Sequence, residues 1–407
     1  MTATRGEAVP SVSNIAVRRA ETVARRFAKF LALGDFEAAA RRHLPYMLYD
    51  FIAGGAETNS SIRSNRESFE HYSFIPRVLT DVSKRQHRKT LFGRPYAAPF
   101  GIAPMGAGSI CAYRSDIVMA RAASDRGIPM IVSASSLIPL EEIRRAGPTT
   151  WYQAYLPGDP KRIEPLVERV AAVGYDTFVL TADVPVAANR ENNIRNGFTV
   201  PIKPSVRLVW EGLTHPSWVL GTLARTIVTH GMPHFENMDA TRGPPMFSRQ
   251  LERALGNRDQ LSWEHVKLIR RLWRGTLVIK GVLSVADAQI AKDCGVDGII
   301  VSNHGGRQLD SSISPLHVLP KIVNAVSGIT IMLDGGIRRG SDVLKALALG
   351  AEFVFVGRPF LFAAAVGGEQ GVNHAVELLC SEILRNMALL GVHELSEVTP
   401  EFVVRTQ

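Results

Sequence analysis

Short apolar runs rich in β-branched residues alternate with longer amphipathic stretches along most of this chain. Eight such runs occur, at residues 99–104, 129–133, 150–155, 177–183, 276–280, 298–303, 329–334 and 352–357. Helix-like patterns follow seven of them closely; residues 162–173, for example, place apolar side chains at helical spacing and end at Gly174. Eight strand–helix repeats in order predict a (β/α)8 TIM barrel, an α/β fold. An open doubly wound sheet is the alternative, because the sequence does not show whether the sheet closes.

One connection is far longer than the others. Almost eighty residues separate Asp183 from the helix-like stretch at 262–272, whereas loops in this fold are usually short. The apolar stretch 208–232, which contains two tryptophans, lies within this connection. We expect a long insert after strand 4, at about 197–260, that forms an active-site lid, a membrane-contact patch or a packed helical excursion.

The rest of the chain divides around the barrel. We expect a basic N-terminal extension at 1–35, with helical character, the barrel domain at 36–395 and a C-terminal tail at 396–407. Residues 1–34 contain six basic and two acidic residues. The extension is interpreted as a helix docked on the barrel; contact with a membrane or partner and an organellar transit peptide are the alternatives.

The composition narrows the class of protein. The 407 residues are 46% hydrophobic and 21% charged, which excludes disordered and fibrous classes for most of the chain. No uninterrupted apolar run reaches about 18 residues, so no membrane-spanning helix is expected. The net charge of +9 favours anionic small molecules or an anionic membrane surface over a nucleic-acid groove. Three widely spaced cysteines form no metal-binding spacing and no disulfide framework, which fits a reducing compartment.

Nearly every apolar run ends in a polar or conformationally permissive residue. Because active sites of (β/α)8 barrels lie at the C-terminal ends of the strands, this pattern predicts a ring of functional groups around one cavity. The residues are Met105, Gly106, Ser133, Gln153, Tyr155, Thr181, Asp183, Lys280, Ser302, His304, Asp334, Gly357 and Arg358.

Two glycine clusters at the last two strand ends predict a phosphate site. Gly336 and Arg338 follow Asp334 after strand seven, and Gly357 precedes Arg358 after strand eight. Glycine lets backbone N–H groups approach an anion, and the start of the next helix adds a favourable dipole. Loops after strands seven and eight are the usual phosphate site of this fold.

A histidine and two arginines predict acid–base chemistry on a carboxylate. His304 follows strand six and precedes Arg307 by three residues, and Arg190 follows Asp183 by seven. Histidine transfers protons near neutral pH, and arginine clamps carboxylates bidentately. We interpret His304 as catalytic, with Asp183 orienting it. Lys280 is either a Schiff-base nucleophile or a fixed positive charge.

These residues together resemble the FMN-dependent L-2-hydroxy-acid oxidases and dehydrogenases, which include glycolate and lactate oxidases and membrane lactate and mandelate dehydrogenases. The resemblance covers about residues 36–395. It rests on Leu44-Pro45, Tyr49-Asp50, Gly54-Gly55-Ala56-Glu57, Gln153-Ala154-Tyr155, Thr181-Ala182-Asp183, Lys280-Gly281, SNHGGRQLD at 302–310, DGGIRRG at 334–340 and Gly357-Arg358-Pro359.

The resemblance implies a role for each residue of the ring. His304 is the implied base, paired with Asp183, while Arg307 and Arg190 hold the substrate carboxylate and Tyr155 binds the substrate oxygen. Lys280 is implied to stabilise the reduced flavin, which displaces the Schiff-base interpretation. The implied FMN ligands are Ala103, Pro104, Met105, Gly106, Ser133, Gln153, Thr181, Lys280, Ser302, Asp334, Gly336, Arg338, Gly357 and Arg358. No metal is implied.

The implied reaction is the FMN-dependent oxidation of an L-2-hydroxy acid to the 2-oxo acid. Electrons are expected to pass to a quinone or cytochrome; an oxygen-using oxidase that produces hydrogen peroxide is the alternative. An FMN barrel isomerase and an inactive scaffold are the alternatives of other classes. The resemblance further implies a cytoplasmic homotetramer, with peripheral contact to the cytoplasmic face of the inner membrane as an open option.

Three positions depart from the family pattern. Phe51 replaces a tyrosine that usually helps to bind the carboxylate, which removes a charge-assisted hydrogen bond worth about 1.5–3 kcal/mol. Gly106 and Ser135 stand where the oxidases often carry alanine and tryptophan, so both changes enlarge or reshape the pocket. We therefore expect a substrate larger and more apolar than glycolate, similar to lactate or mandelate.

Overall fold

Eight parallel strands close into a barrel in the computed structural model, which describes residues 26–198, 206–246, 248 and 256–406. Neighbours follow chain order from β4 to β11, and β11 closes the ring on β4 with Val354 opposite Phe100. The strands are β4 (Phe100–Ile102), β5 (Met130–Ser133), β6 (Thr150–Ala154), β7 (Thr177–Thr181), β8 (Thr276–Val282), β9 (Gly298–Val301), β10 (Thr330–Asp334) and β11 (Phe353–Val356). Seven lie within the predicted runs, β8 extends two residues beyond its run, and the closure confirms the barrel over the open sheet.

The strands read as continuous apolar runs because both of their faces are covered. One set of side chains fills the barrel interior: Ala103, Ile131, Trp151, Val179, Val278, Ile300, Met332, Phe353 and Phe355. A hairpin of β2 (Lys89–Leu91) and β3 (Arg94–Tyr96) adds Leu91 and Tyr96 to this cluster, and Trp151 Nε1 donates a hydrogen bond of 3.3 Å to the Tyr96 hydroxyl. The hairpin therefore plugs the N-terminal end of the barrel and leaves the C-terminal mouth for chemistry.

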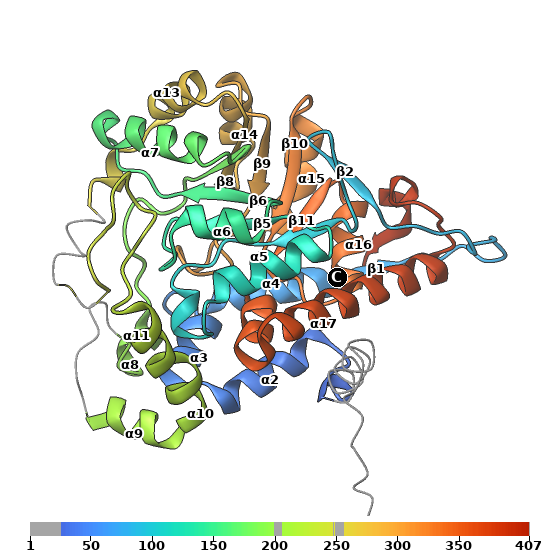
Figure 1. Ribbon diagram of the computed structural model, residues 1–407. Coiled ribbons are helices and arrows are strands. Elements are labelled where there is room, and N and C mark those ends of the chain that lie inside the picture. Colours follow the sequence, from blue (N-terminus) through green and yellow to red (C-terminus); the bar gives the residue numbers. More distant parts are fainter. Residues whose placement is uncertain (1–25, 199–205, 247, 249–255, 407) are drawn as a thin grey trace, which may run out of the picture.

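Helices surround the barrel (Figure 1). They are α5 (Ser115–Asp125), α6 (Leu140–Ala146), α7 (Pro160–Ala172), α13 (Trp263–Leu272), α14 (Val285–Asp293), α15 (Pro315–Ala325), α16 (Gly340–Ala348) and α17 (Arg358–Leu390). Residues next to each other in the sequence explain where α7 starts. The Asp159 carboxylate caps the helix by accepting a hydrogen bond of 3.0 Å from the Lys161 backbone N–H, and Pro160 occupies the first turn.

Segments from both ends of the chain pack on the barrel. The N-terminal helices are α2 (Leu33–His43), α3 (Tyr46–Ala53) and α4 (Ser60–Glu70). Phe36 of α2 is buried, and Phe27 stacks on His374 of α17 with ring centroids 5.5 Å apart. At the other end, β12 (Val403–Arg405) pairs antiparallel with β1 (Tyr72–Phe74), so the predicted tail contributes to a two-stranded sheet. Most of the predicted basic extension, residues 1–25, lies outside the described residues.

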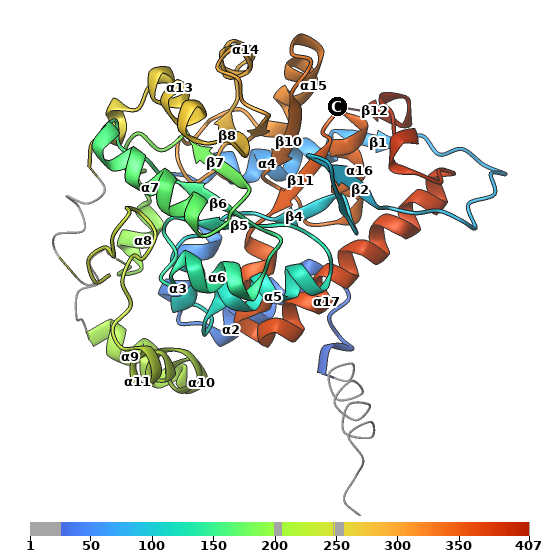
Figure 2. The same cartoon turned by 45° about the horizontal axis from the view of Figure 1, so that its top comes forward.

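The long connection from β7 to α13 forms a group of short helices, all but the first of them within the predicted insert. They are α8 (Glu191–Arg195), α9 (Val206–Thr214), α10 (Pro216–Trp218), the π-helical stretch η2 (Val219–Ala224), α11 (Arg225–His230) and η3 (Arg258–Gln260). Figures 1 and 2 show α9, α10 and α11 together at one end of the molecule, outside the ring of barrel helices. Residues 199–205, 247 and 249–255 of the predicted insert lie outside the described residues. Among the described helices, none combines the length and apolar character needed to cross a bilayer.

Candidate active site

A buried lysine ties together three strand ends at the barrel mouth. Lys280 on β8 is 3% exposed, and its Nζ lies 3.1 Å from Asp334 Oδ2 at the end of β10 and 2.9 Å from Ser302 Oγ after β9. Burial alone would lower the pKa of Lys280, but the carboxylates of Asp334 and Asp183 raise it above its ordinary value. A raised pKa favours a fixed positive charge over a Schiff-base nucleophile, which needs a neutral amine.

A histidine and an aspartate form a hydrogen-bonded pair beside this lysine. His304 Nδ1 lies 2.9 Å from Asp183 Oδ1, and the two side chains are 16% and 14% exposed. The backbone of His304 adopts φ +57°, and its N–H donates a hydrogen bond of 3.0 Å to Ser302 Oγ. Because Nδ1 is engaged by Asp183, Nε2 is the nitrogen available to a ligand. The Tyr155 hydroxyl lies 3.3 Å from that nitrogen.

The electrostatics of the pair suit proton transfer. Burial lowers the pKa of His304 below its ordinary value, against the opposing effect of Asp183. Burial opposes ionisation of Asp183, but His304 and Lys280 hold the pKa of this carboxyl below its ordinary value. At neutral pH the imidazole is therefore neutral and able to accept a proton, and the aspartate is ionised and able to stabilise the resulting cation.

Two guanidinium groups lie on the other side of His304. Arg307 Nη1 donates to the backbone oxygens of Ile52, at 3.1 Å, and Gly54, at 2.5 Å, at the end of α3. Arg190 Nε donates a hydrogen bond of 3.3 Å to the Arg307 carbonyl. Burial lowers the pKa of Arg190 and lowers that of Arg307 well below its ordinary value. Within the described ranges neither arginine forms a salt bridge with Asp or Glu, so both favour an anionic ligand.

A second cationic region surrounds the predicted phosphate site. Gly336 has φ +83°, and a Cβ there would lie 2.3 Å from the Asn65 carbonyl oxygen, so the loop after β10 requires glycine. Gly357 is the N-cap of α17, whose dipole favours an anion. Burial, with Arg338 nearby, lowers the pKa of Arg358 to about 9. In this structure Arg358 Nη2 donates a hydrogen bond of 2.8 Å to the Gly305 carbonyl.

The loop after β4 completes the ring. The Ala107 N–H donates a hydrogen bond of 2.9 Å to the Ser135 carbonyl, which ties this loop to the end of β5. A Cβ on Gly106 would lie 2.6 Å from Ser135 Cβ and 3.6 Å from Ser133 Oγ, and one on Gly357 would lie 3.7 Å from Met105 Sδ. The predicted residues around 103–106 therefore lie next to those of β5 and β11.

Several buried polar atoms at the mouth have no partner in the described part of the chain. They are Oε1 and Nε2 of Gln153, Oγ1 of Thr181, Oδ2 of Asp183 and Oδ1 of Asp334. Buried polar groups in proteins are almost always hydrogen-bonded. These atoms belong to the ends of β6, β7 and β10, so they indicate a ligand with both donors and acceptors inside the ring.

The structure adds residues that sequence reasoning did not single out. The guanidinium of Arg258, from η3 at the end of the insert, lies 4.8 Å from the centroid of the Tyr155 ring. Asn65 of α4 and Asn303 exchange two side-chain hydrogen bonds of 2.8 Å. Nothing near Arg258 or Asn65 in the sequence marks them, because their partners are far away along the chain.

Asp310 anchors the His304 loop on the start of α4. Its carboxylate accepts hydrogen bonds from the backbone N–H and hydroxyl of Thr58, the hydroxyl of Ser60 and the backbone N–H of Ser61. Although burial opposes ionisation, these donors hold the pKa of Asp310 well below its ordinary value. Its stabilising effect is therefore present at neutral pH and is lost only as the pH falls through that lowered pKa.

We expect Asp310→Asn to lower the free energy of unfolding by about 2–3 kcal/mol, because several charge-assisted hydrogen bonds are weakened together. The measurement is urea unfolding followed by far-UV circular dichroism at pH 7. Glu264→Gln is the control, since the fully exposed pair of Glu264 with Lys267 on α13 is screened by water and contributes little to stability. Equal unfolding curves for both variants would contradict the anchoring role.

Comparisons with known proteins agree with this geometry. The family model described as FMN-dependent dehydrogenase matches residues 40–405. The chain is 36% identical to (S)-mandelate dehydrogenase of Pseudomonas putida over 373 residues, covering 91% of this chain and 92% of the relative. It is 38% identical to L-lactate dehydrogenase of Pseudomonas entomophila (strain L48) over 376 residues, covering 91% and 97%.

Solved structures of related enzymes are similar to this chain along most of its length. A crystal structure of the monotopic membrane protein (S)-mandelate dehydrogenase superposes with a TM-score of 0.85 at 35% identity, covering 92% of this chain and 99% of the other. A mandelate oxidase superposes with a TM-score of 0.76 at 35% identity, covering 92% and 98%.

Proposed function

We propose, because this chain belongs to the family of FMN-dependent dehydrogenases, that it oxidises an L-2-hydroxy acid with an apolar side chain to the 2-oxo acid. The chain is an oxidoreductase that acts on a CH–OH group, and its cofactor is FMN. The observation that carries the substrate proposal is the His304–Asp183 pair, which lies at the same barrel mouth as two guanidiniums that have no carboxylate partner among the described residues.

The residues of the mouth fit FMN. The unpartnered atoms of Gln153 and Thr181 match the donors and acceptors of a flavin ring, and Lys280 supplies a positive charge beside them. The unpartnered oxygen of Asp334 suits the hydroxyls of the ribityl chain. When bound, FMN accepts the two electrons of the oxidation. The residues proposed to hold it are Ala103, Pro104, Met105, Gly106, Ser133, Gln153, Thr181, Lys280 and Ser302 around the ring, and Asp334, Gly336, Arg338, Gly357 and Arg358 around the ribityl chain and phosphate.

The remaining side chains bind and deprotonate the substrate. Arg307 and Arg190 hold its carboxylate, and the Tyr155 hydroxyl donates a hydrogen bond to its C2 oxygen. His304 Nε2 accepts the proton that the substrate loses, while the ionised Asp183 stabilises the imidazolium. This division of roles is supported by the 3.3 Å separation of the Tyr155 hydroxyl and His304 Nε2, which lets one substrate oxygen meet both groups.

An apolar substrate side chain is supported by Phe51. Its ring stacks on Phe198 with centroids 4.4 Å apart, and the Arg307 guanidinium lies 5.4 Å from its centroid. Phe51 thus places a hydrocarbon surface where a hydroxyl would otherwise contact the carboxylate. The relatives named for mandelate and lactate span the size range that we propose.

An anaerobic titration of the purified flavoprotein tests this function. We expect L-mandelate and L-2-hydroxyoctanoate to bleach the flavin absorbance at lower concentration than L-lactate, because Phe51 favours apolar side chains. Readmitted oxygen then distinguishes the acceptors: slow reoxidation supports a quinone or cytochrome, and fast reoxidation with hydrogen peroxide supports an oxidase. A bound flavin that no 2-hydroxy acid bleaches would overturn the proposal.

We further propose that the insert rests on the cytoplasmic face of a membrane. On α9 the side chains of Val206, Val209, Trp210 and Leu213 are exposed and follow helical spacing, so they form one apolar face. Leu220 of η2 and Val228 of α11 are further exposed apolar side chains of the insert. A related dehydrogenase is a monotopic membrane protein, and the net charge of +9 favours anionic lipids.

The double variant Trp210→Glu/Leu213→Glu is expected to lose vesicle binding by at least about 100-fold, because each buried apolar side chain contributes about 1.5–3 kcal/mol. Co-sedimentation with anionic phospholipid vesicles measures this binding. Leu389→Glu, at a similarly exposed leucine on α17, is the matched control and should bind as the wild type does. Equal binding of all three proteins would place the membrane contact elsewhere.

A further inference from the structure

A guanidinium group covers the ring of Tyr155 at the catalytic mouth. Arg258, on η3, places its guanidinium carbon 4.8 Å from the centroid of that ring, within the range of a cation–π contact. The hydroxyl of the same tyrosine lies 3.3 Å from His304 Nε2. Tyr155 is therefore the link between the last turn of the insert and the proposed base.

Backbone contacts hold η3 against the loop that follows Tyr155. The Gly158 N–H donates a hydrogen bond of 2.9 Å to the Asn257 carbonyl. A Cβ on Gly158 would lie 2.5 Å from the Gln260 carbonyl oxygen, so only glycine lets the two segments approach this closely. Asn257 and Gln260 lie on either side of Arg258 in the chain. The position of Arg258 is therefore set by backbone packing on the loop after β6.

The charge of Arg258 is not used by another group in the described part of the chain. There its half-buried guanidinium forms no hydrogen bond and no salt bridge. Asp239, whose charge reaches Arg258, already accepts hydrogen bonds of 2.9 and 2.8 Å from Arg162. Burial lowers the pKa of Arg258, but a guanidinium stays protonated in proteins. Because a desolvated cation without a carboxylate partner is costly, we infer that this charge serves the site.

The cation acts on the hydroxyl of Tyr155 through the ring. Burial raises the pKa of Tyr155 above its ordinary value, while the charges of Lys280 and Arg258 oppose that rise. A positive charge over the ring draws electron density away from the hydroxyl oxygen, and the low dielectric of the buried site strengthens this effect. Arg258 therefore makes the hydroxyl a better hydrogen-bond donor.

We propose that Arg258 is a positioning residue for the oxidation, which fixes the Tyr155 ring and strengthens the hydrogen bond from its hydroxyl to the C2 oxygen of the substrate. This inference rests on the proposed function, in which Tyr155 binds that oxygen. Negative charge gathers on the substrate as it loses its proton to His304, and the C2 oxygen carries part of that charge. A stronger donor at this oxygen favours the transition state over the bound substrate, so Arg258 acts on the chemical step.

A double-variant cycle tests the coupling between Arg258 and the Tyr155 hydroxyl, with flavin reduction in the holoenzyme followed by anaerobic stopped-flow absorbance. Arg258→Met removes the charge and keeps a hydrocarbon stem, and should slow reduction about 5- to 30-fold, the range of a desolvated cation–π contact. In the Tyr155→Phe background the same change should alter the rate less than about twofold. Arg258→Lys keeps a cation over the ring and should retain most of the rate.

Arg77→Met is the matched control for the loss of a guanidinium from an aromatic ring. The Arg77 guanidinium also lies 4.8 Å from a ring centroid, that of Phe402, but near the C-terminal end of α17. This variant should reduce its flavin at the wild-type rate. An unchanged rate in Arg258→Met would overturn the inference. So would an equal slowing with and without the Tyr155 hydroxyl, because Arg258 would then act by another route.

Ligand binding to the oxidised holoenzyme needs no turnover, so it separates this inference from the proposed function. Phenylglyoxylate carries a C2 oxygen and phenylacetate does not; flavin absorbance measures the binding of each. Arg258→Met should bind phenylglyoxylate about fivefold more weakly, and phenylacetate as the wild type does. Equal affinity changes for both ligands would overturn the role of Arg258. A wild-type flavin that no hydroxy acid bleaches would instead overturn the proposed function, and the binding comparison would still decide what Arg258 does.

Discussion

His304→Asn is expected to slow flavin bleaching by the hydroxy acid about 10²- to 10⁴-fold, the usual contribution of a general base, while the protein keeps its flavin. Asparagine is the suitable replacement because His304 has φ +57°, a backbone conformation that asparagine adopts more readily than most residues. The Ser302 contact to the backbone N–H also survives this change. A loss of rate therefore reports the missing imidazole and not a displaced loop.

Anaerobic stopped-flow absorbance measures this effect, with His393→Asn, at a partly exposed position, as the control that should leave the rate unchanged. Because burial lowers the pKa of His304, the acid limb of kcat/KM should lie below pH 6.5 in the wild type. Asp183 raises the pKa of His304, so Asp183→Asn should move this limb to still lower pH while slowing the reaction. Fast bleaching in His304→Asn would disprove the assignment of the base.

Arg307→Lys is expected to raise the KM for the hydroxy acid about 10- to 100-fold, which corresponds to the loss of one charge-assisted hydrogen bond. In the structure Arg307 Nη1 already donates hydrogen bonds to the carbonyls of Ile52 and Gly54. The rest of its guanidinium is left for the substrate. A lysine ammonium cannot hold these carbonyls and also present a planar fork to a carboxylate.

Steady-state kinetics with a soluble acceptor separate the effect on KM from that on kcat. Arg85→Lys is the matched control, because Arg85 also donates to two backbone carbonyls, those of Leu384 and Val82, but does so away from the mouth. Its KM should equal that of the wild type. An unchanged KM in Arg307→Lys would mean that the carboxylate is bound by other groups.

The barrel could be predicted because each of its strands is buried on both faces. Such strands give continuous apolar runs, and all eight were located by that signal. The extension of β8 to Val282 could not be predicted. A register shift occurs between Lys280 and Val282. Gly281 has φ +103°, and a Cβ there would lie 2.6 Å from Asp183 Cβ. The contact that requires glycine comes from another strand, so local sequence does not report it.

In the candidate site, too, some residues could be predicted from the sequence and others could not. His304, Asp183 and Lys280 could be predicted together because strand ends of a closed barrel meet at one mouth. The structure brings His304 into contact with Asp183 and places Lys280 close enough for Asp183 to raise its pKa. Their chemical roles stay predictions. Arg258 could not be found, because the path of the insert that carries it over Tyr155 depends on long-range packing. For the same reason, the sequence left the function of the insert open between lid, membrane contact and packed excursion.

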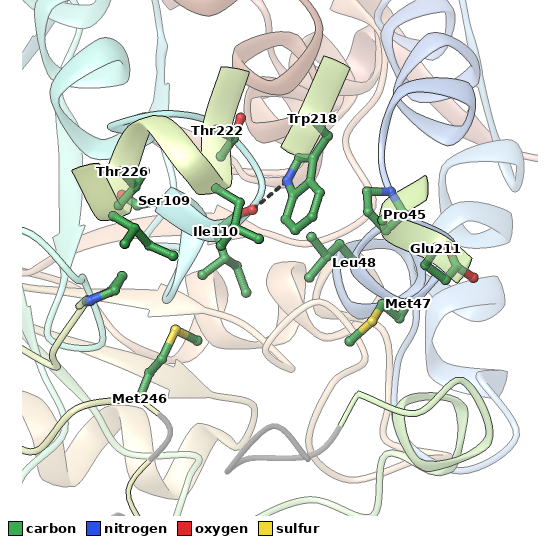
Figure 3. A pocket seen from close by; sticks show the side chains of 14 residues that line it. Pro45, Met47, Leu48, Ser109, Ile110, Glu211, Trp218, Thr222, Thr226 and Met246 are labelled. Atoms are coloured by element: carbon green, nitrogen blue, oxygen red, sulfur yellow. Dashed lines mark hydrogen bonds between the residues drawn. The ribbon is translucent and has the colours of Figure 1, made fainter. Parts of the chain in front are cut away.

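Helix α3 borders the catalytic mouth and an apolar pocket at once. Its C-terminal carbonyls, at Ile52 and beyond, hold Arg307, and its earlier residue Leu48 lines an apolar pocket between the insert and the barrel (Figure 3). A helix of two turns moves as a rigid unit, so a shift that improves one site alters the other. Thermodynamic linkage then requires reciprocity: if an occupant of that pocket changes the affinity for the hydroxy acid by some factor, the acid changes the affinity of the occupant by that same factor.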